Sequence, residues 1–528
     1  MRPGHRLLGA LAGLLVGALG GGVSCLGASA FSCDDDAACD LRADGRCEAD
    51  GHCSYPDDTC PLGRRYADAG ELGDECVGAA TGSTGSTSGT GTDSSTGTTA
   101  DTEPTTGTDT DTDTDTGSGL DPCTALWTID RPTPNEGGAA GWSVAVDDAG
   151  DVVIAGWSFA AGSGNQLWVG KYSAFAEPRW EAALGKLAET DSRAGLALWP
   201  AGDDPAKIVV AAATEAAKQR SEPTLVVLSG DGDELGRRVF DDGDDFEDGD
   251  MNPIDSFDAF ADVAWIADGG SLVVVGSESG GPYDRAIQAR EFAVSGDDPA
   301  AWGESWSATY PLGINRDRGL GVAVADGFIN LGGYRRHAGG GDPIDSAWLG
   351  HLRAGAGDGL VDAGDEWSAE APEGALGARS AAIHGVAVLA DGSIVTVGEH
   401  QLAEGGSRRG WLARWGADGA LVWEETLAVD GYDRDALLEA VIADDAGGFV
   451  VTGSLQTGAQ DQLYVFDLVA RSYAADGSPR WTCTEGDGGA YVGHGLAFTA
   501  EGDVIVVGSR PAPGVEGGSR IWARKYPG

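Results

Sequence analysis

One pattern recurs along the chain from about residue 122 onward. A short apolar strand is followed by an Asp-Gly-type turn, a Val/Ile-rich strand ending in Gly, a third strand, a second turn and then Trp. Clear copies begin at residues 144, 386 and 496. Because one four-stranded unit cannot bury its faces alone, such units must stack on their neighbours. The pattern therefore predicts an all-β repeat array.

The array has seven units. The ends of the second strands lie 55 to 66 residues apart, at Gly156, Ala212, Gly276, Gly332, Gly398, Gly453 and Gly508. Six fourth strands carry an aromatic residue, at Trp180, Phe240, Trp306, Trp367, Trp423 and Trp481. The seventh unit lacks a fourth strand, whereas residues 123–130 form a strand without a unit and supply Trp127.

An N-terminal strand that completes the last unit would close the array into a ring and leave no exposed sheet edge. We therefore predict a seven-bladed β-propeller over residues 122–528. A linear β-solenoid is the alternative, but it would need a cap at each end and would not explain the split repeat.

Three motifs extend this interpretation: the strand Asp317-Arg-Gly-Leu-Gly-Val-Ala-Val, the strand Val169-Gly-Lys-Tyr172 and the turn Ala417-Asp-Gly-Ala-Leu-Val-Trp423. They resemble the secreted bacterial β-propeller repeats known as SBBP and their delta-60-like relatives. The resemblance covers most of residues 122–528 and implies the propeller fold, but almost nothing about function. Unit two departs from the pattern, because Ala212 and Phe240 replace its Gly and Trp.

The first thirty residues are ordered as in a secretory signal peptide: a basic start, an apolar stretch from Leu7 to Leu19, and small residues up to Ala30. The mature chain would then begin at Phe31 and be secreted. The alternative is a bacterial lipobox ending at Cys25, which would make the protein a lipid-anchored component of the cell envelope. No other stretch has the roughly twenty apolar residues that a membrane-spanning helix needs.

Cysteines concentrate in a module at residues 31–77, which has little apolar content of its own. An even set of cysteines in an exported chain indicates disulfides, and six allow 15 connectivities. The module contains Cys33, Cys39, Cys47, Cys53, Cys60 and Cys76. Its sequence also looks like the leader that precedes such arrays in some bacterial surface proteins. No C-x-x-C pair is present, which argues against a zinc site here.

Two further cysteines, Cys123 and Cys483, flank the repeats beside fourth-strand tryptophans of neighbouring units. We predict a disulfide between them that clasps the ring closure. It requires Cα atoms within about 7 Å, which outer strands of adjacent blades would not necessarily meet. Residues 78–121, almost only Thr, Gly, Ser and Asp, form a disordered spacer between the module and the propeller.

The charge balance restricts the partners. With 84 acidic and 34 basic residues the formal net charge is −50, so nucleic acid and anionic membrane surfaces are repelled. Such acidity also favours a soluble monomer. We expect a protein or glycan partner at the cell surface.

One set of residues has the chemistry of a metal site. Counting fourteen positions back from the second-strand ends of units five, six and seven leads to His384, Glu439 and His494. These positions are expected where innermost strands enter the central channel, and two imidazoles with a carboxylate suit zinc or another transition metal. The alternative is that polar residues at strand starts cap turns or contact water in the channel.

A second set, Asp191, Asp258, Asp317 and Asp435, precedes first strands, with Arg193 and Arg318 alongside. Aspartate in this position usually binds nearby backbone and fixes the turn between blades. The functional alternative is a charged rim that binds a polar ligand at the channel mouth.

Catalytic motifs are not apparent: the sequence has no Asp box, no G-x-S-x-G, no H-E-x-x-H and no P-loop. We therefore expect a non-enzymatic binding or scaffold propeller without a cofactor. The alternatives are an extracellular polymer hydrolase or lyase that uses the channel mouth, and a structural component of the envelope.

Overall fold

The computed structural model describes residues 46–47, 53–56 and 64–66 and most of 121–528. The gaps in that last part are at 133–136, 188–192, 200–205, 217–219, 241–258, 267–269, 282–283, 311–316, 338–343, 356–366, 371–379, 402–406, 428–434, 461–462, 514 and 516–517. The chain divides into two compact units, residues 1–112 and 113–528. The proposed signal peptide, Cys25 and the spacer up to residue 120 lie outside the described residues.

The first unit contains a three-stranded antiparallel sheet formed by β1 (Arg46–Cys47), β2 (Cys53–Pro56) and β3 (Arg64–Tyr66). Cys47 stands directly opposite Cys53 in this sheet. Cys33, Cys39, Cys60 and Cys76 lie outside the described residues, so the disulfide pairing of this module stays a prediction.

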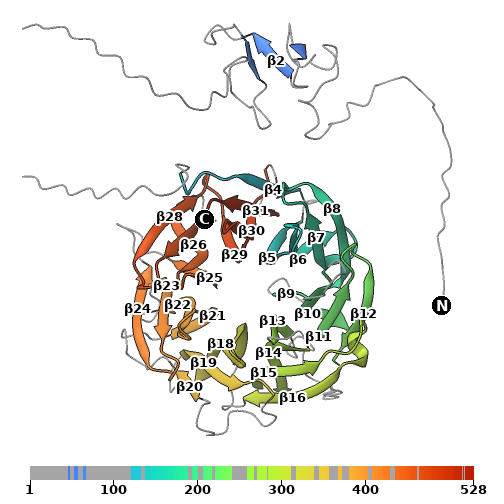
Figure 1. Ribbon diagram of the computed structural model, residues 1–528, viewed down its shortest axis with the longest axis vertical. Helices are drawn as coiled ribbons and strands as arrows, with labels where there is room; N and C mark the ends of the chain where they lie inside the picture. Colours follow the sequence, from blue (N-terminus) through green and yellow to red (C-terminus); the bar gives the residue numbers. More distant parts are fainter. Residues whose placement is uncertain are drawn as a thin grey trace, which may run out of the picture. The chain divides into compact units, whose positions relative to one another are not determined.

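The second unit is a seven-bladed β-propeller (Figure 1), as the repeat predicted. Each blade is a four-stranded antiparallel sheet, and its first strand lies next to the central axis. Within the described residues, no helix has the length and apolar character needed to cross a membrane.

The strands follow one another blade by blade. Blade 1 consists of β5 (Ala139–Val146), β6 (Val152–Ala160), β7 (Gly164–Tyr172) and β8 (Pro178–Lys186). Blade 2 consists of β9 (Gly195–Leu198), β10 (Ile208–Ala216), β11 (Arg220–Leu228) and β12 (Glu234–Val239). Blade 3 consists of β13 (Ala259–Ile266), β14 (Ser271–Gly281), β15 (Asp284–Ala293), the short 3-10 helix η4 (Pro299–Ala301) and β16 (Gly303–Tyr310).

The remaining blades repeat this order. Blade 4 consists of β17 (Arg318–Ala325), β18 (Phe328–His337), β19 (Ile344–Arg353) and β20 (Trp367–Glu370). Blade 5 consists of β21 (Ser380–Val388), β22 (Ile394–Gln401), β23 (Arg408–Trp415) and β24 (Leu421–Leu427). Blade 6 consists of β25 (Ala436–Ala443), β26 (Phe449–Gln460), β27 (Leu463–Tyr473) and β28 (Pro479–Glu485). Blade 7 consists of β29 (Val492–Phe498), β30 (Val504–Pro511), β31 (Ser519–Tyr526) and the N-terminal β4 (Trp127–Arg131).

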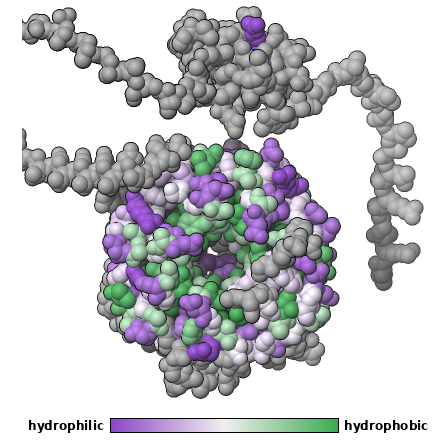
Figure 2. All heavy atoms as spheres, in the orientation of Figure 1, coloured by the Kyte–Doolittle hydropathy of each residue, from purple (hydrophilic) through white to green (hydrophobic). Residues whose placement is uncertain are grey.

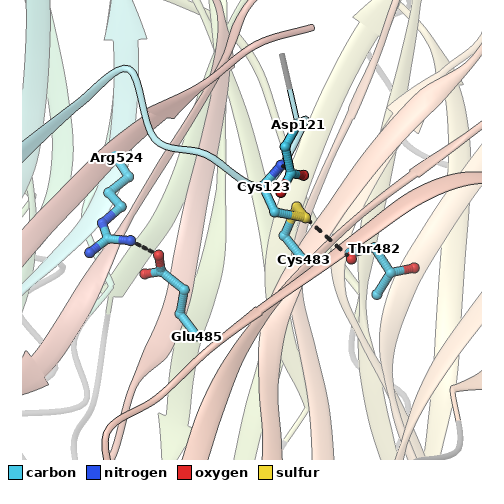
Figure 3. The surroundings of a disulfide bond; sticks show 6 residues. All are labelled: Asp121, Cys123, Thr482, Cys483, Glu485 and Arg524. Carbon is cyan, nitrogen blue, oxygen red and sulfur yellow. Dashed lines mark hydrogen bonds and ion pairs between the residues drawn. A yellow bond between two sulfur atoms is a disulfide. The ribbon is translucent and has the colours of Figure 1, made fainter. Parts of the chain in front are cut away.

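The ring closes through β4, which pairs antiparallel with β31 from Ile521↔Arg131 to Lys525↔Trp127. A disulfide joins Cys123, just before β4, to Cys483 in β28 of blade 6, with the Cα atoms 5.2 Å apart (Figure 3). The predicted clasp is therefore confirmed. The bond does not join two outer strands, because Cys123 lies in the segment before β4, whose Leu126 N–H already donates to the carbonyl of Lys525 in β31.

Each innermost strand except β9 carries a β-bulge in the described part of the propeller. The residue before the bulge pairs with the glycine that ends the repeat pattern of the second strand. A Cβ atom on that glycine would lie 1.8 to 2.0 Å from a carbonyl oxygen of the first strand. The glycines are thus required by close backbone approach rather than by a turn.

The predicted position of the second-strand glycine in unit four, Gly332, is wrong by one residue. In unit four the equivalent glycine is Gly333, which pairs with Gly319 and whose Cβ would meet the carbonyl of Arg318, and not Gly332. Blade 2 tolerates Ala212 because β9 begins only at Gly195, so no bulged strand faces that position.

Two fourth-strand tryptophans, Trp180 and Trp423, contact a turn of the next blade. Trp180 of blade 1 donates a hydrogen bond to the carbonyl of Gly230, in the turn between the third and fourth strands of blade 2, at 2.9 Å. A Cβ atom on Gly232 in the same turn would lie 2.6 Å from the Trp180 ring, and Gly477 stands in the same relation to Trp423 at 3.0 Å. The Gly of the Asp-Gly turn therefore makes room for the tryptophan of the preceding blade.

The prediction that Phe240 is the fourth-strand aromatic of blade 2 is wrong. In register, Gly236 faces Val227 as Trp180 faces Lys171 in blade 1. A side chain on Gly236 would meet Pro299 of η4, so this short helix of blade 3 fills the space. Phe240 instead packs edge-on against Phe260, with the ring centroids 5.1 Å apart.

Candidate functional site

A cavity of about 390 Å³ lies at the centre of the ring, lined by the innermost strands of the blades. In Figure 2 the middle of the propeller is hollowed, and hydrophilic residues are visible inside it. Most of the lining residues are aliphatic, chiefly valine, leucine and alanine. The polar and aromatic groups of the lining are Trp142, Ser143, Arg193, Asp262, His384, Glu439 and His494.

Residues at the bulges of the innermost strands line this cavity. Trp142, His384, Glu439 and His494 are each the extra residue at the bulge of an innermost strand. A bulge turns its extra residue away from the normal alternation of the strand, which lets it project toward the axis. The polar groups therefore gather near the end of the channel where the innermost strands begin.

Arg193 connects opposite sides of the ring. It lies before β9 of blade 2, yet its Nη2 atom donates to Glu439 Oε2 of blade 6 at 2.5 Å and to His384 Nδ1 of blade 5 at 3.0 Å. His384 Nδ1 also lies 3.2 Å from Glu439 Oε2, so one imidazole nitrogen is within hydrogen-bond distance of both the guanidinium and the carboxylate.

Trp142 and His494 form the aromatic side of the cluster. Their ring centroids are 4.0 Å apart, and Arg193 Cζ lies 5.6 Å from the centroid of Trp142. His494 Nε2 is 3.5 Å from Ser509 Oγ. Trp142 Nε1 and His494 Nδ1 are buried and have no hydrogen-bond partner among the described residues. Buried polar atoms normally have a partner, so these two nitrogens indicate a bound molecule or water.

Charges and burial shift the titration of these groups. Burial alone would raise the pKa of Glu439, but the charge of Arg193, together with His384, holds it well below its usual range. Burial lowers the pKa of His494 to about 4. Burial raises the pKa of Asp262 to about 6, although the backbone N–H groups of Val322 and Val263 both bind this carboxylate. At pH 7 Glu439 and Asp262 are thus ionised and His494 is neutral.

The three residues of the metal hypothesis do line one cavity, on three adjacent blades. Within the described part of the chain, however, no group of three His, Cys, Asp or Glu side chains is placed to hold a metal ion. A metal would also have to displace Arg193 from His384 and Glu439. The metal site stays a prediction, and the contacts seen here are those of a hydrogen-bonded organic cation.

The aspartates that precede first strands are only partly described, because Asp191 and Asp258 fall in gaps. Asp317 Oδ1 accepts a hydrogen bond from the backbone N–H of Arg336 at 2.8 Å, and Asp435 Oδ1 accepts from the N–H of Arg408 at 2.8 Å. The second bond links blade 6 to blade 5. Both contacts fit the predicted backbone-fixing role.

Sequence reasoning did not assign Trp142 and Asp262 to the site. Counting fourteen positions back from Gly156 leads to Trp142, which is the bulge residue of blade 1. The same count from Gly276 leads to Asp262, next to the bulge residue Ala261 of blade 3. Arg193 was noted only as part of a charged rim. Its place in the cluster has no signal in the repeat, because blade 2 departs from the pattern.

No family model matches the chain, and no curated protein does. Several solved structures are similar in fold. A protein of unknown function from Dyadobacter fermentans is 13% identical, with a TM-score of 0.36, over 76% of this chain and 98% of its own. The polysaccharide lyase Uly1 is 9% identical, with a TM-score of 0.44, over 73% and 90%. The β-propeller domain of the Trilobed protease from Pyrococcus furiosus is 12% identical, with a TM-score of 0.38, over 70% and 91%. Similarities of this degree carry no information about function.

The shifted pKa values of His494 and Asp262 have opposite effects on the free energy of unfolding in mild acid. Unfolded His494 gains a proton near pH 6.5 but the folded residue only near pH 4, so acidification through this window lowers the free energy of unfolding. Folded Asp262 gains its proton near pH 6, before the unfolded residue does at 3.8, so acidification raises it.

We therefore expect His494→Gln to flatten the loss of stability between pH 6.5 and 4, and Asp262→Asn to steepen it. Each change is at most about 1.4 kcal/mol per pH unit. Urea unfolding at a series of pH values measures these slopes. Parallel curves for the wild type and both variants would contradict the assigned shifts.

Proposed function

We propose that this chain is an exported, surface-associated binding propeller whose ligand site is the central cavity. One observation supports this proposal most strongly. Bulge residues from four blades and Arg193 from a fifth bring charged, imidazole and indole groups together in one partly buried cavity. Such a cluster costs desolvation free energy that aliphatic packing would avoid. Concave, mostly apolar cavities with a few convergent polar groups are the usual form of small-ligand sites.

The proposal includes membership of the SBBP or delta-60-like repeat proteins and display away from a Cys-rich module by a spacer. Export rests on the signal-peptide pattern of residues 1–30. Peptide mapping of the N-terminus of the native protein tests it. A start at Phe31 supports a released protein, a diacylated Cys25 supports a tethered one, and a retained Met1 contradicts both.

Ligand binding is tested on the mature chain and on Glu439→Gln, which keeps the side-chain shape but removes the charge. Both proteins are screened by thermal shift and calorimetry against amines, amino acids, sugars and oligosaccharides, and each mixture is analysed for products. We expect saturable binding with one site per chain, weakened in Glu439→Gln, and no products. Equal responses of the two proteins would place the site elsewhere, and no response would favour a structural envelope component.

The enzymatic alternative is decided by the same mixtures. A hydrolase or lyase acting at the channel mouth would release products from an oligosaccharide or ester, and Glu439→Gln would slow their release. Glu234→Gln in β12 is the matched control, because its carboxylate pairs with Arg237 on the surface. This variant should bind as the wild type does.

A further inference from the structure

We infer that the cavity binds a ligand with a guanidinium or alkylammonium group, which takes the place that Arg193 occupies. The inference rests on the proposed function of the cavity and adds the chemical class of its ligand. A free diamine or guanidine and the arginine or lysine side chain of a partner protein share this chemistry.

The contacts of Arg193 are those of a bound cation. Its guanidinium lies between Glu439, His384 and the face of Trp142, at 2.5 Å, 3.0 Å and 5.6 Å respectively. A carboxylate and an indole face are groups that proteins use to recognise guanidinium and ammonium ligands. The side chain of Arg193 therefore demonstrates how such a head group fits this place.

The main chain of Arg193 lies outside the sheet. The innermost strand β9 has four residues, whereas the other six innermost strands have seven to nine. Its pairing with β10 begins at Gly195, two residues after Arg193. Among the described residues, no strand pair includes Arg193, and its side chain keeps 17% of its surface exposed. It can leave the cavity without breaking a blade.

Exchange of one cation for another keeps the charge of the site balanced. Glu439 is only 6% exposed, and removing its positive partner would leave a buried carboxylate uncompensated. A ligand cation replaces that partner directly. Asp262 adds a second negative charge to the lining, which favours cations over anions in the cavity.

The buried nitrogens agree with this picture. Trp142 Nε1 and His494 Nδ1 remain without partners among the described residues while Arg193 fills the site. A ligand larger than a guanidinium, with a hydroxyl or carbonyl beside its cationic head, would meet both. The aliphatic wall would hold its carbon chain.

The test compares wild type, Arg193→Ala and Arg193→Ala/Glu439→Gln as mature chains by titration calorimetry. The probes are agmatine, the tripeptide amide acetyl-Gly-Arg-Gly and, as the anionic counterpart, glutarate. Arg193 competes with a cationic ligand for Glu439, whereas it would form an ion pair with an anionic ligand. The direction of the Arg193→Ala effect therefore separates the two classes.

We expect Arg193→Ala to bind agmatine at least about tenfold more tightly than the wild type, because the internal competitor is gone. The added Glu439→Gln should weaken that binding by at least about tenfold. Tighter binding of agmatine than of the tripeptide indicates a free small molecule, and the reverse indicates a partner side chain. Arg237→Ala in β12 is the matched arginine control and should bind as the wild type does.

Binding of glutarate that Arg193→Ala abolishes would overturn the inference and leave the cavity as the ligand site. Failure of every protein to bind any cation would also overturn it, and the broader screen with Glu439→Gln would then decide the proposed function separately. If Arg193→Ala does not fold, the wild type and Arg193→Lys are titrated with agmatine. Absence of binding to both is then the contradicting result.

Discussion

Replacing Cys123 by alanine should lower the free energy of unfolding by about 4 kcal/mol, since the disulfide it breaks encloses 360 residues of sequence. The bond ties the segment before β4 to blade 6, so it constrains the unfolded chain over nearly the whole propeller. Without it, the ring is closed mainly by the pairing of β4 with β31, which covers five residues of β4. Urea unfolding of the mature protein measures the change.

Two controls separate the bond from the side chain. Cys483→Ala and the double variant should be destabilised about as much as Cys123→Ala, because each lacks the same bond. Reduction of the wild type should produce a similar loss. A wild type whose stability does not change on reduction of Cys123–Cys483 would contradict the predicted contribution of the clasp.

Gly398→Ala should cost about 3 kcal/mol or prevent folding, because the new Cβ atom would lie 1.9 Å from the carbonyl oxygen of Ala382. The atom it meets belongs to the backbone of the bulged strand, which cannot turn aside as a side chain would. Gly398 pairs with Ile383, and the next residue, His384, is the bulge residue that lines the cavity. The variant should therefore also disturb the cavity.

The matched control is Gly303→Ala. Gly303 also lies in a strand, but nothing stands within 4 Å of its Cβ position. This substitution should change the free energy of unfolding by less than about 0.5 kcal/mol. Similar stability of Gly398→Ala and Gly303→Ala would show that close backbone approach is not what requires glycine in the second strands.

Much of the fold could be predicted because the same packing requirements recur from unit to unit. Six of the seven units need the same close approach at their second-strand glycine, and the turns at Gly232 and Gly477 leave the same space for the tryptophan of the preceding blade. Both requirements leave a regular mark in the sequence. The split repeat then pointed to closure by the strand that carries Trp127. The error at Gly332 arose because two consecutive glycines stand there and only Gly333 pairs with the residue before the bulge. The error at Phe240 arose because η4 of blade 3 fills the space that a fourth-strand tryptophan would take.

The site was predictable only in part. His384, Glu439 and His494 share a register, and this spacing alone predicts that they lie together at the channel. The partner that defines their chemistry, Arg193, lies in the blade that breaks the pattern, and its contacts cross the ring to blades 5 and 6. Such a contact depends on how all seven blades close, which no local spacing encodes.

The most direct test of the central cavity as a ligand site is a crystal structure of the mature protein grown with saturating agmatine, beside one grown without it. The account predicts electron density for the guanidinium between Trp142 and Glu439, with the side chain of Arg193 turned out of the cavity. Arg193 still bonded to Glu439 in both crystals, with agmatine absent or bound on the outer surface, would contradict it.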